Sequence, residues 1–316
     1  MLKSLRIQFP NRRTVQPLTT SLYNHAASPP PSIEFLDLSR CSITDSDIDA
    51  LLIRFDKLKH LVLDHCLNLG DWRLMSEDLT WWSALGNRCA LAGVKRARER
   101  EKSIKAWFEA QSSENRSVSD QHLTYRSRPG RRGLATATIS LRASTPSPGD
   151  PTKNLQPWTK MGPLPKIHII PSLPTLLSIS TSPLMVSDDI PAFSMEIQVS
   201  MIVAFKNGWE DGLRVLRERR SRLATSFLRG TAVGPKARFL KFKDGKDRDE
   251  EEDGFEGLED VEVGDEGAFL EAVDGDGTPI SREPPILCFS GLRSKDEGHI
   301  DGCGHSIASG IWIEEF

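Results

Sequence analysis

Two segments of the chain place apolar residues at the same spacing, 25 positions apart. The apolar positions of the first segment are Ile33, Leu36, Leu38, Cys41 and Ile43. Those of the second segment are Leu58, Leu61, Leu63, Cys66 and, one place late, Leu69. Residues 2–8 carry a shorter version of the pattern. Such a period predicts stacked units, each of which buries its apolar face only against a neighbour.

Each unit is expected to begin with a short strand whose side chains alternate between two faces. Leucines at alternate positions then enter the core, and Cys41 and Cys66 fill small buried sites at the following turns. The intervening residues face the open side of the strands. Four of these open-face residues are the predicted contacts for a partner: Arg6, Asp37, His60 and Asp64.

Two helices are predicted around this repeat region. Residues 46–55 have Ile48, Leu51, Leu52 and Phe55 at helical spacing, with Ser46 or Asp47 as the N-cap. Residues 76–110 form a longer amphipathic pattern, whose apolar stripe is Leu79, Trp82, Leu85 and Cys89, continued by Ile104 and Phe108.

The second half of this long helix is basic. Residues 95–105 contain six basic and two acidic side chains, and Glu101 can pair with Lys105 across one turn. One interpretation is a helix that packs on the repeats through its tryptophans and exposes its basic half to water. The alternative is a nuclear-import signal or a nucleic-acid contact, since basic patches bind phosphate electrostatically.

Farther along, the pattern weakens and then resumes. Residues 112–163 are rich in Ser, Arg, Pro, Thr and Gly and are predicted to be disordered. Leu164, Ile167 and Ile169 repeat the strand spacing weakly. Residues 193–205 alternate and predict a strand, and a helix is expected from an Asn207 cap to Gly230. The buried stripe of that helix is Trp209, Leu213, Leu216, Leu223 and Phe227.

The charge is distributed unevenly along the chain. Residues 244–276 hold sixteen acidic and two basic side chains, so a net charge of −3 conceals a basic body and an acidic segment, which is predicted to be a solvated loop. The five cysteines have no paired spacing, and no stretch approaches the ~18 apolar residues of a membrane span. These features predict a cytoplasmic or nuclear protein without membrane contact.

The C-terminal region contains the residues best suited to chemistry. Cys288, His299, Cys303 and His305 are the ligand types that zinc prefers, and four of them can close a tetrahedral site. The alternative is a glycine-rich turn between strands at 286–289 and 310–313. A Cys303–His305 nucleophile pair would need a third, orienting group, which the sequence does not indicate. Signatures of phosphate-binding loops, nucleophile elbows and metalloprotease helices are absent, which favours a non-enzyme without a cofactor, zinc excepted.

The repeat region resembles a known family. Residues 33–69 are similar to the cysteine-containing leucine-rich repeats of ribonuclease-inhibitor-like proteins, especially those of F-box proteins. The residues that carry the resemblance are Leu36, Leu38, Cys41, Ile43, Leu61, Leu63 and Cys66. The resemblance implies a curved solenoid that holds a protein target on its concave face, and an F-box that recruits a ubiquitin-ligase adaptor. No F-box is visible ahead of the repeats, so the adaptor is expected only if one lies upstream.

The array also shows no N-terminal capping unit. This predicts either a truncated chain, which we favour, or a short array capped by a later segment.

Taken as a whole, the sequence predicts an α/β protein: a short leucine-rich-repeat solenoid fragment followed by a long helix, disordered segments and a small C-terminal α+β unit. The predicted boundaries are 1–75 for the repeats, 76–111 for the helix, 112–163 for the linker, 164–243 for the α+β unit, 244–280 for the acidic loop and 281–316 for the C-terminal strands. The predicted function is a non-catalytic protein-interaction scaffold that resembles the target-recognition region of a ubiquitin-ligase receptor. The alternatives are a nuclear nucleic-acid-associated protein and a zinc-stabilised C-terminal binding module.

Overall fold

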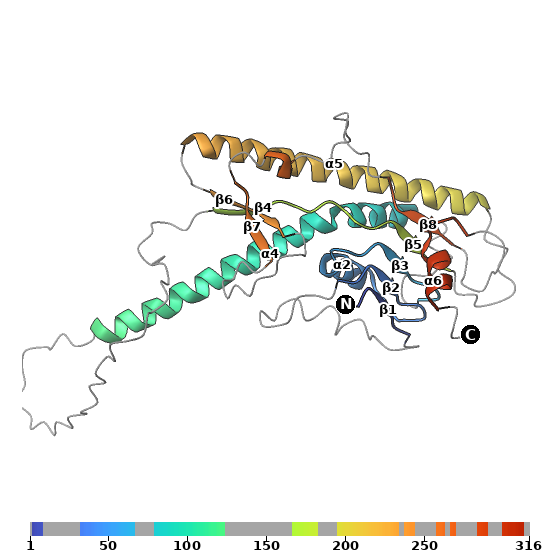
Figure 1. Ribbon diagram of the computed structural model, residues 1–316, viewed down its shortest axis with the longest axis horizontal. Coiled ribbons are helices and arrows are strands. Elements are labelled where there is room, and N and C mark those ends of the chain that lie inside the picture. Colours follow the sequence, from blue (N-terminus) through green and yellow to red (C-terminus); the bar gives the residue numbers. More distant parts are fainter. Residues whose placement is uncertain are drawn as a thin grey trace, which may run out of the picture.

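The chain forms a mixed α/β structure built on two long helices and two small sheets (Figure 1). The computed structural model describes residues 2–8, 32–66, 79–123, 166–182, 195–233, 237–243, 257–262, 266–269, 283–289 and 299–312. None of the helices in these ranges is both long enough and apolar enough to cross a lipid bilayer.

The larger sheet is parallel and follows the predicted repeats. Its strands are β1 (Ser4–Arg6), β2 (Phe35–Asp37), β3 (His60–Val62), β5 (Ser178–Ser180) and β8 (Ile286–Cys288), adjacent in that order. Leu5, Leu36, Leu61, Ile179 and Leu287 occupy one register position across all five strands. The two faces predicted for these strands are confirmed, because Leu36, Leu38, Leu61 and Leu63 lie in one core with Leu5 packed against it, whereas Phe35 and Val62 belong to a separate cluster.

The structure does not show a solenoid. Between β3 and β5 the chain forms the long helix α4 (Leu79–Leu123) and strand β4 (Lys166–Ile169), and between β5 and β8 it forms the long helix α5 (Met195–Val233). The sheet therefore continues, but its later crossovers are not short repeat units. The weak strand spacing at 164–169 marks β4, which belongs to the other sheet, whereas the parallel sheet resumes at β5.

The turns after β2 and β3 have the same geometry. Arg40 and His65 adopt the left-handed conformation, with φ of 63° and 52°. The cysteine after each turn is buried, as predicted, and its thiol donates a hydrogen bond to a carbonyl of the preceding unit: Cys41 to Ile7 at 3.3 Å and Cys66 to Leu38 at 3.2 Å. Each cysteine thus ties one unit to the next.

Helix α2 (Asp45–Arg54) completes the unit between β2 and β3. Ile48, Leu51 and Leu52 are buried, as predicted. The predicted N-cap is wrong by two or three positions, since Thr44 caps the helix. Its hydroxyl accepts a hydrogen bond from the Asp47 amide, and the Asp47 carboxylate accepts one from the Thr44 backbone N–H. This reciprocal pair satisfies two backbone N–H groups at the start of the helix.

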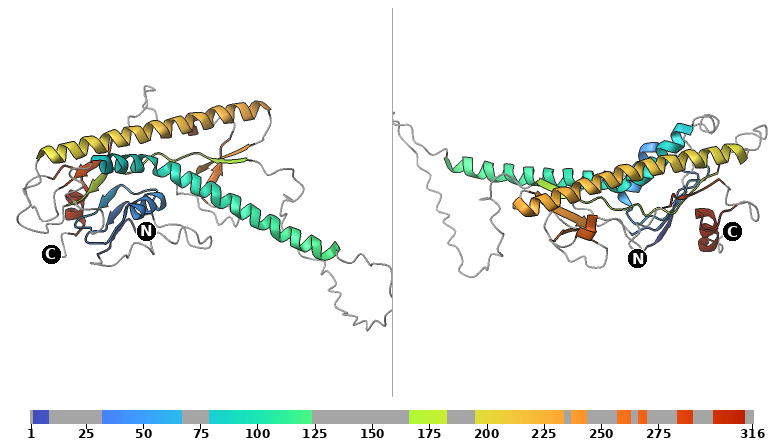
Figure 2. Two further views of the ribbon diagram at one scale, coloured as in Figure 1. Left: turned by 180° about the vertical axis from the view of Figure 1, so that it is seen from behind. Right: turned by 90° about the horizontal axis from the view of Figure 1, so that it is seen from above.

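Helices α4 and α5 pack side by side along their first halves and cover the core side of the parallel sheet (Figures 1 and 2). Both run in the same direction, because Ser83 meets Gly208 and Asn87 meets Gly212. The predicted stripe on α4 is buried at Trp82, Leu85 and Cys89, whereas Leu79 at the helix start is 37% exposed.

The strand predicted at 193–205 is wrong, because from Met195 these residues form the first part of α5. Alternating apolar residues also repeat at every fourth position. Met201 and Phe205 are buried against α4, whereas Met195, Val199 and Val203 are exposed, so only the helical period matches the core. Asn207 and Gly230 lie inside the helix and do not cap it, but the stripe from Trp209 to Phe227 is buried as predicted.

The smaller sheet contains one strand from the middle of the chain and one from the acidic segment, and both pair with β6 (Ala237–Phe242). Strand β6 pairs parallel with β4 and antiparallel with β7 (Leu258–Asp260), which is followed by the short 3-10 helix η3 (Glu266–Phe269). The acidic segment is therefore not a loop throughout. The Arg238 guanidinium donates two hydrogen bonds of 2.6 Å to the Asp260 carboxylate, and Leu258 and Phe269 are buried. These contacts stabilise the folded conformation of β7 and η3.

The predicted disordered linker is wrong in its first part, because α4 continues to Leu123. Residues 124–163 of the linker, and the acidic residues at 244–256, 263–265 and 270–280, lie outside the described ranges.

Candidate metal centre

The open face of the parallel sheet is covered by helix α6 (Gly304–Trp312), on the side away from the long helices (Figure 2). The strand predicted at 310–313 is therefore wrong as far as Trp312. Ala308 packs on Phe35 and Val62, so the strands' outward apolar residues form a small second core with the helix. Gly304 is needed at the start of α6, because a Cβ there would lie 2.8 Å from the Ser180 hydroxyl and 2.9 Å from Val62.

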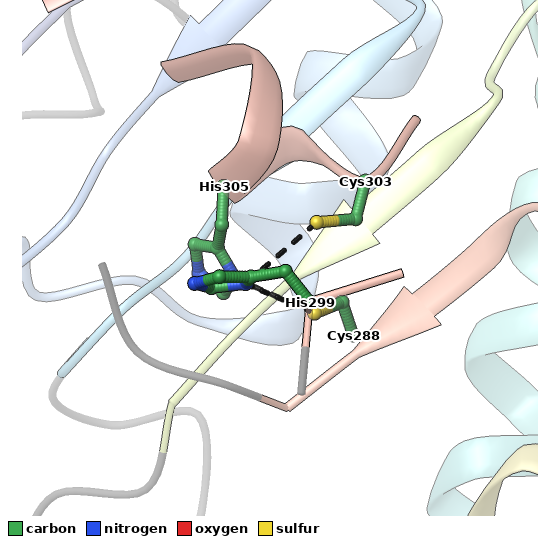
Figure 3. Close-up of side chains that lie close together, drawn as sticks. All are labelled: Cys288, His299, Cys303 and His305. Atoms are coloured by element: carbon green, nitrogen blue, oxygen red, sulfur yellow. Dashed lines mark hydrogen bonds between the residues drawn. The ribbon is translucent and has the colours of Figure 1, made fainter. Parts of the chain in front are cut away.

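The approach of α6 brings together the four predicted metal ligands (Figure 3). Cys288 ends β8, His299 and Cys303 lie in the segment before α6, and His305 is in its first turn. One ligand atom from each lies within 4.8 Å of all the others. His305 Nδ1 is 3.5 Å from the Cys288 sulfur, and His299 Nδ1 is 3.9 Å from the sulfurs of both Cys288 and Cys303.

These separations fit a tetrahedral zinc site. Zinc bonds of about 2.3 Å to sulfur and 2.0 Å to nitrogen, at tetrahedral angles, place a sulfur and a nitrogen ligand about 3.5 Å apart. Cys288, Cys303 and His305 are each at most 2% exposed. The cluster can therefore hold a metal ion with four protein ligands in a nearly closed site.

Asp64 lies behind the cluster and orients one ligand. His305 Nε2 is 2.8 and 3.0 Å from the two Asp64 carboxylate oxygens, across 241 residues of sequence. An ionised carboxylate only accepts hydrogen bonds, so Nε2 donates and Nδ1 is directed toward the sulfur of Cys288. A carboxylate that holds the outer nitrogen of a metal-binding histidine is a recurrent feature of zinc sites.

The charge state of the cluster is consistent with metal binding. Burial by itself lowers the pKa of His305, but hydrogen bonds to Asp64 and Cys288 outweigh it and raise that pKa to about 9. Without a metal, His305 therefore keeps both ring protons at neutral pH, and an incoming ion must displace the one on Nδ1. Burial also raises the pKa of the Cys303 thiol, which a bound cation would deprotonate.

The four predicted partner contacts lie on the strand face that was expected to be open to a partner, but that face is partly covered at these residues. Asp37 is fully buried and Asp64 is 2% exposed, so the prediction that these two carboxylates are accessible is wrong. Arg6 pairs with Asp37 at 3.0 Å and lies over the Trp312 ring, and His60 bonds the Ser178 hydroxyl at 2.9 Å. Helix α6 contributes to this at Asp64, which His305 contacts, and at Arg6, which lies against Trp312. Asp37 and His60 are instead engaged by residues of the strands and their turns.

The basic part of α4 takes part in packing. Lys95 pairs with Asp49 of α2, and the Arg96 guanidinium donates hydrogen bonds to the carbonyls of Leu52 and Ile53 at the end of that helix. The predicted pair of Glu101 with Lys105 is wrong. Glu101 instead lies 3.5 Å from Arg219 of α5 and accepts a hydrogen bond from the Ile169 amide.

Sequence reasoning missed Asp64 as a partner of the cluster, because no local pattern links residues 241 positions apart. It also missed the orienting group for His305, which Asp64 provides. The imidazole faces the thiol of Cys288, not that of Cys303 as the nucleophile alternative assumed.

Comparison of the chain with protein-family models, curated proteins and solved structures found no match in any of the three.

Proposed function

We propose that this protein is a non-catalytic interaction scaffold whose C-terminal segment is fixed to the parallel sheet by a structural zinc ion. The observation that carries the zinc site is the convergence of ligand atoms from Cys288, His299, Cys303 and His305 within 4.8 Å. Two sulfurs and two imidazoles form a donor set typical of structural zinc.

The arrangement supports a structural centre more strongly than a catalytic one. A catalytic zinc site keeps one position for water or substrate, whereas here four protein side chains supply a full tetrahedral set. Cys288, His305 and Asp64 do follow one another as a thiol, an imidazole and a carboxylate. The Cys288 sulfur, however, belongs to a residue that is only 2% exposed and faces two imidazoles, which favours a metal ligand over a nucleophile.

The scaffold part of the proposal rests on the repeat units. The left-handed turns at Arg40 and His65, each followed by a buried cysteine, support the likeness to cysteine-containing leucine-rich repeats. From that likeness we propose a protein as the partner, of the kind held by target-recognition repeats. A role in a ubiquitin ligase follows from the resemblance alone. The nucleic-acid alternative is not favoured, since Lys95 and Arg96 are engaged with α2.

Metal analysis of the purified full chain tests the zinc site. We expect about one zinc per chain, and Co²⁺ in its place should give the absorption of a tetrahedral site with thiolate ligands. His299→Ala removes the most accessible ligand and should leave the purified protein nearly metal-free. His168→Ala is the matched control, because this histidine lies on β4 against Phe239, in the other sheet. Wild-type protein that binds no zinc would end the proposal.

The role of Asp64 can be tested separately. Asp64→Asn preserves the shape of the side chain but removes its charge, so the zinc dissociation constant should rise about 10- to 100-fold, as for other carboxylates behind zinc-bound histidines. Asp37→Asn is the control, because Asp37 is an equally buried carboxylate one strand away. Competition with a chelator of known affinity measures both variants. Equal affinities for the two would show that Asp64 does not act through His305.

A further inference from the structure

Residues 299–312, which we call the cover, lie over the open face of the parallel sheet and contact it through a small set of described residues. Its apolar contact consists of Ala308 against Phe35 and Val62, with Ile307 and Trp312 partly buried at the margin. The Arg6 guanidinium lies 5.7 Å from the centre of the Trp312 ring. Gly304 lies close to Ser180 and Val62, and further contacts of the segment converge on the ligand cluster and on the bond between His305 and Asp64.

The closed position of the cover also buries polar atoms that have no hydrogen-bond partner among the described residues. These atoms are those of the Ser180 hydroxyl and the Trp312 indole N–H. Each such group loses its hydrogen bonds to water without gaining a protein partner, which opposes closure. A helix of nine residues is also too short to be stable by itself in water. Without a metal, the closed position therefore depends on this small apolar contact and on the bond between His305 and Asp64, and it lacks the bonds that an ion would make to the four ligands.

The sheet beneath the cover does not depend on it. Leu36, Leu61 and Ile179 face the opposite side, where they share one large core with α2, α4 and α5. Leu287 and Phe289, on either side of Cys288, belong to that core, but none of the described residues 299–312 does, so the repeat strands keep their main support when α6 leaves.

We infer that zinc occupancy controls access to the open face of the sheet: with zinc bound, residues 299–312 cover it, and loss of zinc releases them. Release uncovers Phe35 and Val62 beside Arg6, Asp37 and Asp64, the surface on which the proposed scaffold function depends. The inference rests on the zinc site of that proposed function. The chain's own C-terminal segment is thus the occupant of this face in the metal-bound form.

Hydrogen–deuterium exchange of the full chain, with and without a zinc chelator, tests the inference. Chelation should speed amide exchange in residues 304–312 at least about tenfold, which is the sign of local opening. Peptides within 82–97 of α4 and 201–216 of α5 should exchange as before. Protection of 304–312 that persists after zinc is removed would overturn the inference, and so would equal loss of protection in α4 and α5.

A second variant tests the coupling from the opposite direction. Ala308→Asp places a charge against Phe35 and Val62 without altering a ligand, so it should open the cover and weaken zinc binding by about tenfold, because coupling is reciprocal. Ser309→Asp adds the same charge at an exposed neighbour and should leave zinc affinity unchanged. Equal zinc affinity in the two variants would overturn the coupling.

The experiments distinguish failure of the zinc site from failure of the control of access. One zinc per chain together with a cover that stays closed after chelation would preserve the zinc site and remove the control of access. A chain that binds no zinc would remove both.

Discussion

Gly208→Ala is expected to destabilise the protein by about 3 kcal/mol or more, because it adds a methyl group where two helix backbones touch. A Cβ at this position would overlap the carbonyl oxygen of Ser83 on α4, and one at Gly86 would overlap that of Phe205 on α5. Since backbone atoms line the contact, no side chain can rotate away, and the helices must separate. Urea denaturation followed by circular dichroism measures the effect.

Gly230→Ala is the matched control in the same helix. Nothing lies within 4 Å of a Cβ at this position, so only helix propensity changes. Alanine should therefore stabilise the protein by up to about 1 kcal/mol. If Gly208→Ala were as well tolerated as Gly230→Ala, the close parallel packing of α4 and α5 would be contradicted.

Leu61→Asp is expected to prevent stable folding of the repeat region. Leu61 is fully buried at the centre of the parallel sheet, between Leu36 and Ile179 in register, and an aspartate there would be a buried charge without a partner. The free energy of unfolding should fall by more than about 4 kcal/mol, a change that single substitutions cause only when they severely disrupt the core. Expression should yield insoluble protein or a chain without a cooperative unfolding transition.

Leu177→Asp separates this effect from a general intolerance of acidic residues. Leu177 directly precedes β5 in the same sheet, but its side chain is 53% exposed. Its replacement should change the free energy of unfolding by no more than about 0.5 kcal/mol. Soluble, cooperatively folding Leu61→Asp protein would show that the assigned strand register is wrong.

The sequence alone was sufficient to predict the secondary-structure elements and buried faces that depend on local contacts. Leu36 and Leu38 lie two positions apart, and Leu61 and Leu63 repeat that spacing 25 positions later, so strands β2 and β3 and their core-facing leucines were predictable. The same is true of the stripes on α4 and α5 and of the buried cysteines. In each case a short period in the sequence matches the geometry of a single element, and that element's core face follows from it.

Local patterns failed where two periods coincide or where the partner is distant. Residues 195–205 satisfy both an alternating and a four-residue spacing, and only packing against α4 selected the helix. The acidic segment contributes β7 because Arg238 pairs with Asp260 and because Leu258 is buried, and the charge composition of the segment indicates neither contact.

At the candidate metal centre, too, some features follow from the sequence and others only from the tertiary structure. The sequence by itself determined the ligand types, since cysteine and histidine at 288, 299, 303 and 305 are suited to zinc whatever fold surrounds them. Only the tertiary structure placed their ligand atoms within 4.8 Å of one another and set Asp64 behind His305. It also turned the expected open face into a covered one. Burial and coordination depend on which surfaces meet in space, and these surfaces come from segments up to 241 residues apart.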